Sequence, residues 1–368
     1  MDAILLVGGF GTRLMPLTKH RPKPLMPLAN IPFTERTIAW LAAAGVDHVI
    51  LSVHYNTAQF IEHFTRKALG VRISFAPEER PLGTGGAILN CAPHLRSDQC
   101  LVVNGDIFTD LQLPALIAAH HRTQALVSIA LKTVADPSRF GVIELNADMG
   151  ICSFTEKPAH EQTLSNEINA GIYLLERRAL EHFPPGASSV ERDVFPTMLK
   201  NDLPLFGFRS RPYWTDLGTP KDYLQAHRDI LQRRVAVPMP GTEIMPGIWV
   251  GAQTHIAENA ILHAPLLLGN RVIVGPGVEL GPNLVLGDDV HIGRQARLRD
   301  SVLWNRVAVC AESVISESIA GQQAHLDGRI HGGLCADFGI LHQFASRRAG
   351  MRVPAPHAPV ATVSRPAA

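Results

Sequence analysis

A glycine-rich stretch near the start of the chain contains the first residues whose types and spacing could do chemistry. The apolar run AILLV (3–7) leads directly into GGFGTRLMPLTKHRPKPL (8–25). Glycines after a strand let backbone N–H groups approach anionic oxygens, as in many phosphate-binding sites. The pattern alone is weak, because it has neither the third glycine of a dinucleotide fingerprint nor the GK[ST] of a P-loop, and a tight turn would explain it equally well.

Two cations make phosphate binding the better interpretation. Arg13 lies in the loop, and a guanidinium can hold a phosphate with two parallel hydrogen bonds. Lys23 stands between Pro22 and Pro24, which restrict the backbone on both sides and would pre-position its ammonium at low entropic cost. The alternative is that Lys23 is an ordinary solvated loop lysine. The stretch therefore predicts a binding site for a polyphosphate.

Six further motifs extend this interpretation. They are PLGTGGAI (81–88), NGDIFTD (104–110), FTEKP (154–158), NAGIY (169–173), SSVERDVFP (188–196) and WTDLGTPKDY (214–223). Together with the glycine loop, and in this order, they resemble the signature of the nucleotide-sugar pyrophosphorylases, which join a nucleoside triphosphate to a sugar 1-phosphate. PLGTGG, SVERDVFP and DLGTPKD in combination are most similar to the mannose-1-phosphate guanylyltransferases. The resemblance implies transfer of GMP from GTP to mannose 1-phosphate.

The implied reaction brings two polyanions together, so it needs cations and a metal ion. The resemblance assigns catalytic roles to Arg13, Lys23 and Lys157, and assigns Asp106 and Asp216 to Mg²⁺. Two carboxylates suffice, because magnesium takes its other ligands from substrate phosphates and water. Without the resemblance, Asp106 would be interpreted as a turn residue and Asp216 as part of a helix N-cap region.

The resemblance divides the remaining site residues between the two substrates. Those implied for the nucleotide are Gly8, Gly9, Gly11, Thr12, Glu78 and Gly83. Those implied for the sugar phosphate are Gly141, Glu156, Lys157, Asn169 and Gly171. In the family the lysine contacts the phosphate and the glutamate contacts a sugar hydroxyl, while Asn169 can both donate and accept, which suits a polyol. Gly171 would leave room for the sugar ring. Without the family, EKP would be an exposed strand end and turn.

Recognition of the base is predicted to involve Glu78. Guanine presents N1–H and N2–H₂ as adjacent donors, and one carboxylate can accept from both, whereas adenine and uracil lack this pair. The distance of Glu78 from Gly83 places it where related enzymes read the base. The alternative is that Glu78 and Glu79 are ordinary solvated acids.

A catalytic function is favoured over a regulatory one by the charged residues that the chain keeps. A catalytically silent regulatory subunit would keep both domains and lose charged site residues, but this chain keeps Arg13, Lys23, Asp106, Lys157 and Asp216. Met15 stands where the family usually has another arginine, which indicates altered triphosphate affinity rather than lost activity. The acceptor stays open, because glucose 1-phosphate, another hexose or a cyclitol phosphate such as valienol 1-phosphate would suit the same motifs.

Alternating strands and helices must position these residues. The predicted strands are AILLV (3–7), HVILSV (48–53), VRISFA (71–76) and CLVVN (100–104), and the predicted helices, each ending at a glycine, are TERTIAWLAAAG (34–45) and TAQFIEHFTRKALG (57–70). This rhythm predicts an α/β, Rossmann-like, mostly parallel sheet with ligands at the carboxyl ends of its strands. The predicted nucleotidyltransferase domain covers residues 1–232.

A second pattern begins at Val250, from which every sixth residue is aliphatic as far as Leu298; the repeat degrades at Trp304 and Cys310. This hexapeptide repeat predicts a left-handed parallel β-helix over residues 248–335. Hexapeptide repeats could also suggest an acyltransferase, but no catalytic-histidine signature is recognisable in them. The β-helix is therefore predicted to brace the first domain and to mediate a homo-oligomer.

Composition and charge argue against several other classes of protein. The 368 residues carry a net charge of only +1, spread along the chain, which argues against nucleic-acid and membrane partners. No apolar run is long enough to span a membrane. The five cysteines show no CxxC spacing, which fits a cytoplasmic protein. Residues 233–247 are a predicted Pro-rich linker, and residues 346–368, rich in Pro, Ala and Arg, are predicted to be disordered.

Overall fold

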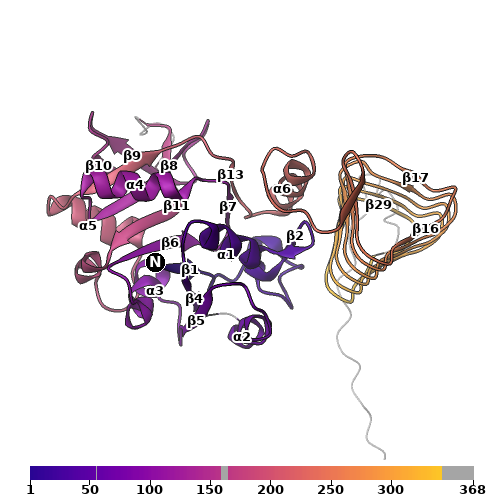
Figure 1. Cartoon of the computed structure of the whole chain (residues 1–368), viewed down its shortest axis with the longest axis horizontal. Helices are drawn as coiled ribbons and strands as arrows, with labels where there is room; N and C mark the ends of the chain where they lie inside the picture. The colour runs from indigo at the N-terminus through magenta and orange to yellow at the C-terminus, as the bar shows by residue number, and fades with distance from the viewer. Residues whose placement is uncertain (55, 159–164, 342–368) are drawn as a thin grey trace, which may run out of the picture.

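The computed structural model describes residues 1–54, 56–158 and 165–341. Figure 1 shows an α/β part that contains the N-terminus and, beside it, a stack of short strands of triangular cross-section, with helix α6 between the two. The predicted disordered tail, residues 346–368, lies outside the described residues.

The α/β part is built on a nine-stranded sheet in the order β10-β9-β11-β6-β1-β4-β5, with β8 paired to β11 and β12 paired to β8. The four predicted strands form its parallel half, in the order β6-β1-β4-β5: β1 (Asp2–Leu6), β4 (His48–Val53), the edge strand β5 (Arg72–Pro77) and β6 (Gln99–Asn104). The remaining strands are β8 (Val127–Thr133), β9 (Gly141–Leu145), β10 (Ile151–Glu156), β11 (Glu167–Glu176) and β12 (Leu205–Arg209). Strand β11 runs antiparallel to β6, β8 and β9. The predicted α/β fold class is confirmed.

Both faces of this sheet are covered, which is why its central strands are continuous apolar runs. In β1, Ile4 packs into one core cluster, and Ala3 and Leu5 pack into the other. The first cluster also contains residues of α3 (Gly83–Cys91) and α5 (Phe195–Lys200). The second contains residues of α1 (Phe33–Ala43), α2 (Thr57–Thr65) and α4 (Leu113–Thr123).

The predicted helix over 57–70 is too long. Helix α2 ends at Thr65, five residues before Gly70, whereas α1 ends near its glycine, with Gly45 at φ 89°. The buried residues of α2 are Phe60 and Phe64, and residues 65–68 are exposed. A short helix needs packing to hold each turn, and beyond Phe64 that packing is missing. No helix among the described residues has the length and apolar character needed to cross a membrane.

The second part is a parallel β-helix whose strands form three sheets. The seven-stranded sheet consists of β14 (Thr242–Met245), β15 (Ile248–Val250), β18 (Leu266–Leu268), β21 (Leu284–Leu286), β24 (Val302–Leu303), β27 (Ile319–Ala320) and β30 (Leu334–Cys335). The six-stranded sheet consists of β16 (His255–Ile256), β19 (Ile273–Val274), β22 (His291–Ile292), β25 (Ala308–Val309), β28 (His325–Leu326) and β31 (Ile340–Leu341). The five-stranded sheet consists of β17 (Ile261–Leu262), β20 (Glu279–Leu280), β23 (Arg297–Arg299), β26 (Val314–Ser316) and β29 (Arg329–His331). Strand β14, inside the segment predicted as a linker, pairs antiparallel with β15.

The length of the coils explains where the hexapeptide repeat degrades. In the first coils the paired residues are 18 positions apart, as in Ile248 with Leu266, which is three repeats of six. The offset then falls to 17, as in Val302 with Ile319, and to 15 in Ile319 with Leu334. The loss of one residue and then of two more at the corners moves the inward-facing positions out of the sixfold series while the parallel pairing continues.

The two parts share an apolar interface. The middle residues of the seven-stranded sheet, among them Leu267 and Val285, point outward yet are fully buried, because they pack against α6 (Pro220–Leu231) and the segment after β1. Polar contacts join the same surfaces: the Trp304 Nε1 donates to the Tyr223 hydroxyl at 3.1 Å, and the Asn30 amide donates to the Leu286 carbonyl at 2.7 Å. The segment that follows the glycine loop is thus held directly against the β-helix.

Candidate active site

The chain after β1 is folded back on itself, so that the two halves of the opening stretch touch. It passes through two short 3-10 turns, Thr12–Leu14 and Lys23–Leu25. Gly11 has φ 63°, and a Cβ there would lie 2.9 Å from the Cβ of Lys23. Glycine is therefore required at position 11 both by the backbone conformation and by the closeness of the lysine. A Cβ on Gly9 would meet no atom of the described chain within 4 Å, which leaves open space at that glycine.

Two short antiparallel strands bring the predicted metal ligands together. Strand β13 (Trp214–Asp216) pairs with β7 (Ile107–Thr109), which places Asp216 opposite Ile107 and beside Asp106. The Lys23 Nζ lies 2.9 Å from Asp106 Oδ2 and 3.8 Å from Asp216 Oδ1. The Arg13 guanidinium lies 3.7 Å from Asp216 Oδ2. Four predicted residues from three distant segments therefore form one cluster, which is called the charged cluster below.

Within the charged cluster, the negative charge of Asp216 is incompletely stabilised. Burial and the neighbouring Asp106 raise the pKa of Asp216, against the opposing effect of Lys23 and Arg13. The buried Asp216 Oδ1 accepts no hydrogen bond from the described residues. No group of three or more His, Cys, Asp or Glu side chains in the described ranges could hold a metal ion, so a Mg²⁺ here would have to take further ligands from substrate and water. The two carboxylates present fit that requirement.

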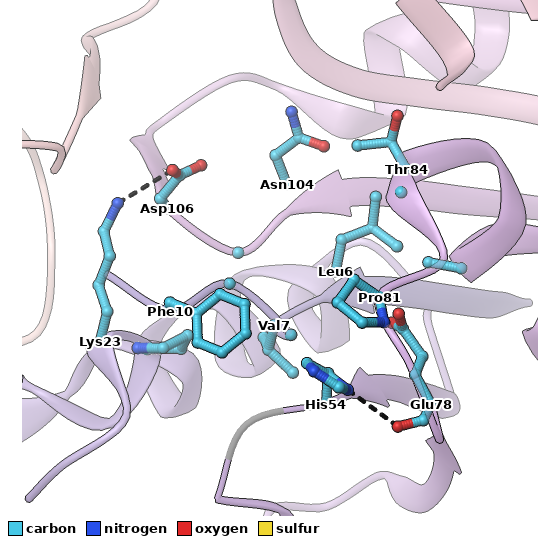
Figure 2. Close-up of a pocket in the computed structure, with 16 residues that line it drawn as sticks. Leu6, Val7, Phe10, Lys23, His54, Glu78, Pro81, Thr84, Asn104 and Asp106 are labelled. Atoms are coloured by element: carbon cyan, nitrogen blue, oxygen red, sulfur yellow. Dashed lines mark hydrogen bonds and ion pairs between the residues drawn. The ribbon is translucent and has the colours of Figure 1, made fainter. Parts of the chain in front are cut away.

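A cavity of about 370 Å³ adjoins the charged cluster. Figure 2 shows its wall, with Lys23 and Asp106 on one side and Glu78, His54 and Pro81 on the other. Of the residues predicted for the nucleotide, Gly8, Gly9, Glu78 and Gly83 line it. The predicted Thr12 begins the first 3-10 turn instead and is exposed. The cavity is also lined by residues that the sequence did not single out, namely Phe10, His54, Thr84, Asn104 and Gly105.

Glu78 faces the cavity, but its carboxylate already has partners within the chain. Its Oε1 accepts from the Ser52 hydroxyl at 2.8 Å, and its Oε2 accepts from the Leu82 N–H at 3.0 Å. The second bond holds the start of the PLGTGG loop. Glu78 therefore has a structural role, whether or not it also contacts a base.

The glycines of PLGTGG are required by another segment of the chain. Gly83 has φ 67°, and a Cβ on it would lie 2.5 Å from the Ser188 carbonyl oxygen. The Gly85 N–H donates to that same oxygen at 2.8 Å. The side chain of Glu191 accepts from Thr84 at 2.7 Å and from Ser189 at 2.6 Å. The SVERDVFP motif thus fixes the first turn of α3, which lines the cavity.

The residues predicted for the sugar phosphate form a second group, at the ends of β9 and β10. Gly141 pairs with Glu156, and a Cβ on Gly141 would lie 3.0 Å from Glu156 Oε2. The Lys157 Nζ lies 3.2 Å from Glu156 Oε1, and its side chain is 58% exposed. Lys157 also has φ 48°, a left-handed conformation that is uncommon for a residue with a side chain. Its N–H donates to the Phe140 carbonyl at 3.0 Å, which stabilises this conformation.

Asn169 and Gly171 lie in β11, where the pairing with β8 shifts register between Asn169 and Tyr173. The Asn169 Oδ1 accepts from the Gly171 N–H at 2.9 Å, and its Nδ2 donates to the Tyr173 hydroxyl at 2.8 Å. Tyr173 is fully buried; burial and Glu191 raise its pKa far above the usual range. The two predicted substrate regions are thereby connected inside the protein, from Asn169 through Tyr173 and Glu191 to Thr84. The sequence showed NAGIY and SVERDVFP as separate motifs.

Comparison with protein families identifies two matches. The model described as nucleotidyl transferase matches residues 2–233, and the model described as GMPPB C-terminal domain matches residues 262–332. The chain is 38% identical over 283 residues to a mannose-1-phosphate guanylyltransferase of Mycobacterium tuberculosis, which covers 75% of this chain and 77% of that protein. It is 39% identical over 230 residues to a mannose-1-phosphate guanyltransferase of Schizosaccharomyces pombe, over 61% of this chain and 62% of that protein.

Solved structures agree with the fold. HddC from Yersinia pseudotuberculosis, in a crystal structure complexed with GMP-PN, matches with a TM-score of 0.55 and 29% identity, over 62% of this chain and 99% of that one. A UDP-glucose pyrophosphorylase complexed with UDP-glucose matches with a TM-score of 0.57 over 63% of this chain and 99% of that one. At 21% identity, the second likeness supports the fold alone.

Proposed function

The chain belongs to the nucleotidyl transferase family, and we propose that it transfers GMP from GTP to mannose 1-phosphate, giving GDP-mannose and pyrophosphate. The relatives named as mannose-1-phosphate guanylyltransferases support this substrate pair. The observation that carries the proposal is the charged cluster, in which Lys23 and Arg13 face Asp106 and Asp216, and of which Lys23 and Asp106 line the cavity.

The chain's own residues contribute mainly charge and position. The glycines beside the cavity leave space for an anionic group, and Lys23 and Arg13 supply positive charge to the triphosphate. Lys157, at an exposed strand end, is proposed to bind the phosphate of the sugar substrate, with Glu156 beside it for a hydroxyl. Bound Mg²⁺ at Asp106 and Asp216 would neutralise phosphate charge. The reaction needs no covalent nucleophile, because the sugar phosphate oxygen itself attacks the α-phosphorus.

The direct test is pyrophosphate release from a matrix of four nucleoside triphosphates against mannose, glucose and other hexose 1-phosphates and valienol 1-phosphate. We expect the highest kcat/KM for GTP with mannose 1-phosphate. A higher value for another acceptor would replace mannose by that acceptor and leave the reaction class intact. Absence of pyrophosphate release with every pair would support a catalytically silent regulatory subunit.

Selection of guanine by Glu78 is a separate part of the proposal. Each carboxylate oxygen that accepts one bond from the chain retains a further lone pair for a guanine donor. Inosine triphosphate lacks the N2 amine, so wild-type protein should use it about tenfold to a hundredfold less well than GTP. Glu78→Gln should reduce that preference. If the variant discriminates as well as the wild type, backbone groups of PLGTGG become the better candidates for reading the base.

Assembly and location complete the proposal. We propose a homo-oligomer formed through the β-helix, supported by its exposed edge strand β14 with Ile244 and Met245. All five cysteines lie within the described residues and are free, which supports a cytoplasmic location. Sedimentation of the full chain, compared with a variant carrying Ile244→Lys, tests the assembly.

A further inference from the structure

Among the described residues that line the cavity, Asn104 has a buried side-chain oxygen without a hydrogen-bond partner. It is the last residue of β6, pairs in register with Leu6 of β1, and lies two positions before Asp106. Its side chain lines the cavity. Its Oδ1 is buried and accepts no hydrogen bond from any described residue. A buried amide oxygen without a donor is unfavourable, so such an atom calls for a partner from outside the chain.

The amide of Asn104 is held in place by the strand that carries the predicted sugar-binding residues. A Cβ on Gly171 would lie 2.7 Å from Asn104 Nδ2 and 3.1 Å from its Cγ. Gly171 has φ 72° and is fixed in turn by its N–H bond to Asn169 Oδ1. Any larger residue at 171 would displace the asparagine. The bare glycine thus lets β11 pack directly on the amide and restricts its orientation.

The position of the amide defines what it can contact. In Figure 2 the Asn104 side chain stands between those of Asp106 and Thr84, with its oxygen turned to the Thr84 side. Asp106 belongs to the charged cluster, and Thr84 belongs to the first turn of α3, where it donates to Glu191. Asn104 therefore lies where the cavity, the charged cluster and β11 meet.

We infer that the Asn104 Oδ1 accepts a hydrogen bond from a hydroxyl group of a bound substrate and thereby selects for that hydroxyl. A neutral carbonyl oxygen suits a hydroxyl donor, whereas it would repel a phosphate oxygen. The hydroxyl comes either from the ribose of the nucleotide or from the hexose of the acceptor, and both have the same chemistry. The inference deepens the proposed function and rests on it for the identity of the substrates.

The test is a cycle that combines one substitution with the removal of single hydroxyls. Full-length wild type and Asn104→Leu are compared on GTP, 2′-deoxy-GTP and 3′-deoxy-GTP with mannose 1-phosphate, and on GTP with deoxy-mannose 1-phosphates. Leucine keeps the approximate size and removes the acceptor. Asn90→Leu is the control, since Asn90 is an asparagine outside the cavity that donates to the Pro77 carbonyl.

We expect one deoxy substrate to lower kcat/KM of the wild type by roughly tenfold to a hundredfold. Asn104→Leu should show a loss of that order on the natural substrates and no further loss on that one substrate analogue. Calorimetric binding of the same ligands should follow the same pattern. If Asn104→Leu only disturbed packing, kcat/KM would fall by the same factor for every substrate. The variant would then still discriminate between substrates with and without the hydroxyl.

The outcomes separate this inference from the proposed function. If the wild type is active but Asn104→Leu discriminates against every deoxy substrate as strongly as the wild type, Asn104 does not read a hydroxyl and the inference fails alone. If Asn104→Leu does not fold, Asn104→Ser, which keeps an oxygen further from the substrate, should give weakened discrimination, and undiminished discrimination would overturn the inference. If the wild type neither binds nor converts any of these pairs, both fail.

Discussion

The β-helix and the active site differ in the sequence separation of the residues that touch. In the β-helix, paired residues are 15 to 18 positions apart, and the inward side chains are apolar and buried. In the active site, Lys23 meets Asp106 across 83 positions and Thr84 meets Glu191 across 107. The site also holds buried oxygens of Asp216 and Asn104 that lack a hydrogen-bond partner among the described residues. The first region is thus a repeated apolar core, and the second contains polar groups that are left to bind a ligand, so substitutions in the two regions should have separable effects.

The largest expected effect concerns the charged cluster. Asp216→Asn and Asp106→Asn should each lower kcat by at least about a hundredfold at saturating Mg²⁺. For Asp216 the pKa is raised by burial and by Asp106, so its ionised form destabilises the fold, and Asp216→Asn should keep or raise Tm. Steady-state kinetics and thermal unfolding measure both. The control is Asp289→Asn, in a surface pair with Arg271, which should leave kcat unchanged. Near-normal activity of either cluster variant would contradict the assignment.

The converse substitution lies in the β-helix. Leu286 is fully buried inside the coils, so Leu286→Ala should lower the free energy of unfolding by about 2–5 kcal/mol. Ile273→Ala, at a position 44% exposed on the same domain, should cost under about 1 kcal/mol. The kcat per folded molecule should stay near wild type in both. If Leu286→Ala lowered kcat at a temperature where the protein remains folded, the separation between the two regions would be wrong.

A buried histidine between the two regions gives the third prediction. Burial and the nearby Arg36 lower the pKa of His227 from 6.5 to about 3. Between these two values the unfolded chain binds the extra proton, so stability falls as pH falls through this window, at about 1.4 kcal/mol per pH unit. The slope comes from a fully buried ring that packs against Tyr223, with its Nε2 lacking a partner among the described residues.

His227→Gln should therefore unfold less steeply with acid than the wild type. Denaturant unfolding at pH 7, 6, 5 and 4 gives the slope independently of any constant loss of stability. His94→Gln, on an exposed side chain, should keep the wild-type slope. If the unfolding free energy changed with pH equally in His227→Gln and in the wild type, His227 would not be the source of the acid destabilisation.

A smaller effect is expected at Lys157. Lys157→Ala should raise KM for mannose 1-phosphate about tenfold and change KM for GTP less, because the lost cation is assigned to one phosphate. The positive φ of Lys157 suggests Lys157→Gly as the matched variant, since glycine tolerates the backbone and also removes the charge. Similar values for Ala and Gly would attribute the effect to the charge. An equal rise in both KM values would place Lys157 elsewhere in the reaction.

The smallest effect concerns the connection between the two substrate regions. Glu191→Gln would lose part of the bonding to Thr84 and Ser189, and we expect kcat/KM to fall about fivefold. Asp193→Asn is the control, because Asp193 caps the same turn by accepting from the Ser189 N–H. A double-mutant cycle of Glu191→Gln with Thr84→Val should be non-additive. Additive effects would mean that the two residues act independently.

Much of the fold followed from local patterns. Strands β1, β4 and β6 were predicted because both faces of a parallel sheet are buried, which leaves apolar runs such as CLVVN. The β-helix was predicted because each coil repeats the same inward positions, and this period is visible without any knowledge of the fold. The predicted end of α2 was wrong. The packing of Phe60 and Phe64 stabilises the last turn of this helix, and the position of Gly70 does not reveal where that packing ends.

The sequence by itself determined the residue types of the charged cluster and of the two substrate regions, since cations, carboxylates and glycines stand in motifs that can be read locally. Only the tertiary structure decided which of them meet. Strand β13 pairs with β7, so that Asp216 lies beside Asp106. The carboxylate oxygens of Glu78 accept hydrogen bonds from the Ser52 hydroxyl and the Leu82 N–H. The fold also places Gly171 directly against the side chain of Asn104, whose Oδ1 has no hydrogen-bond donor among the described residues. Hydrogen-bond satisfaction depends on every neighbour within about 3 Å, and those neighbours come from segments far apart in the chain.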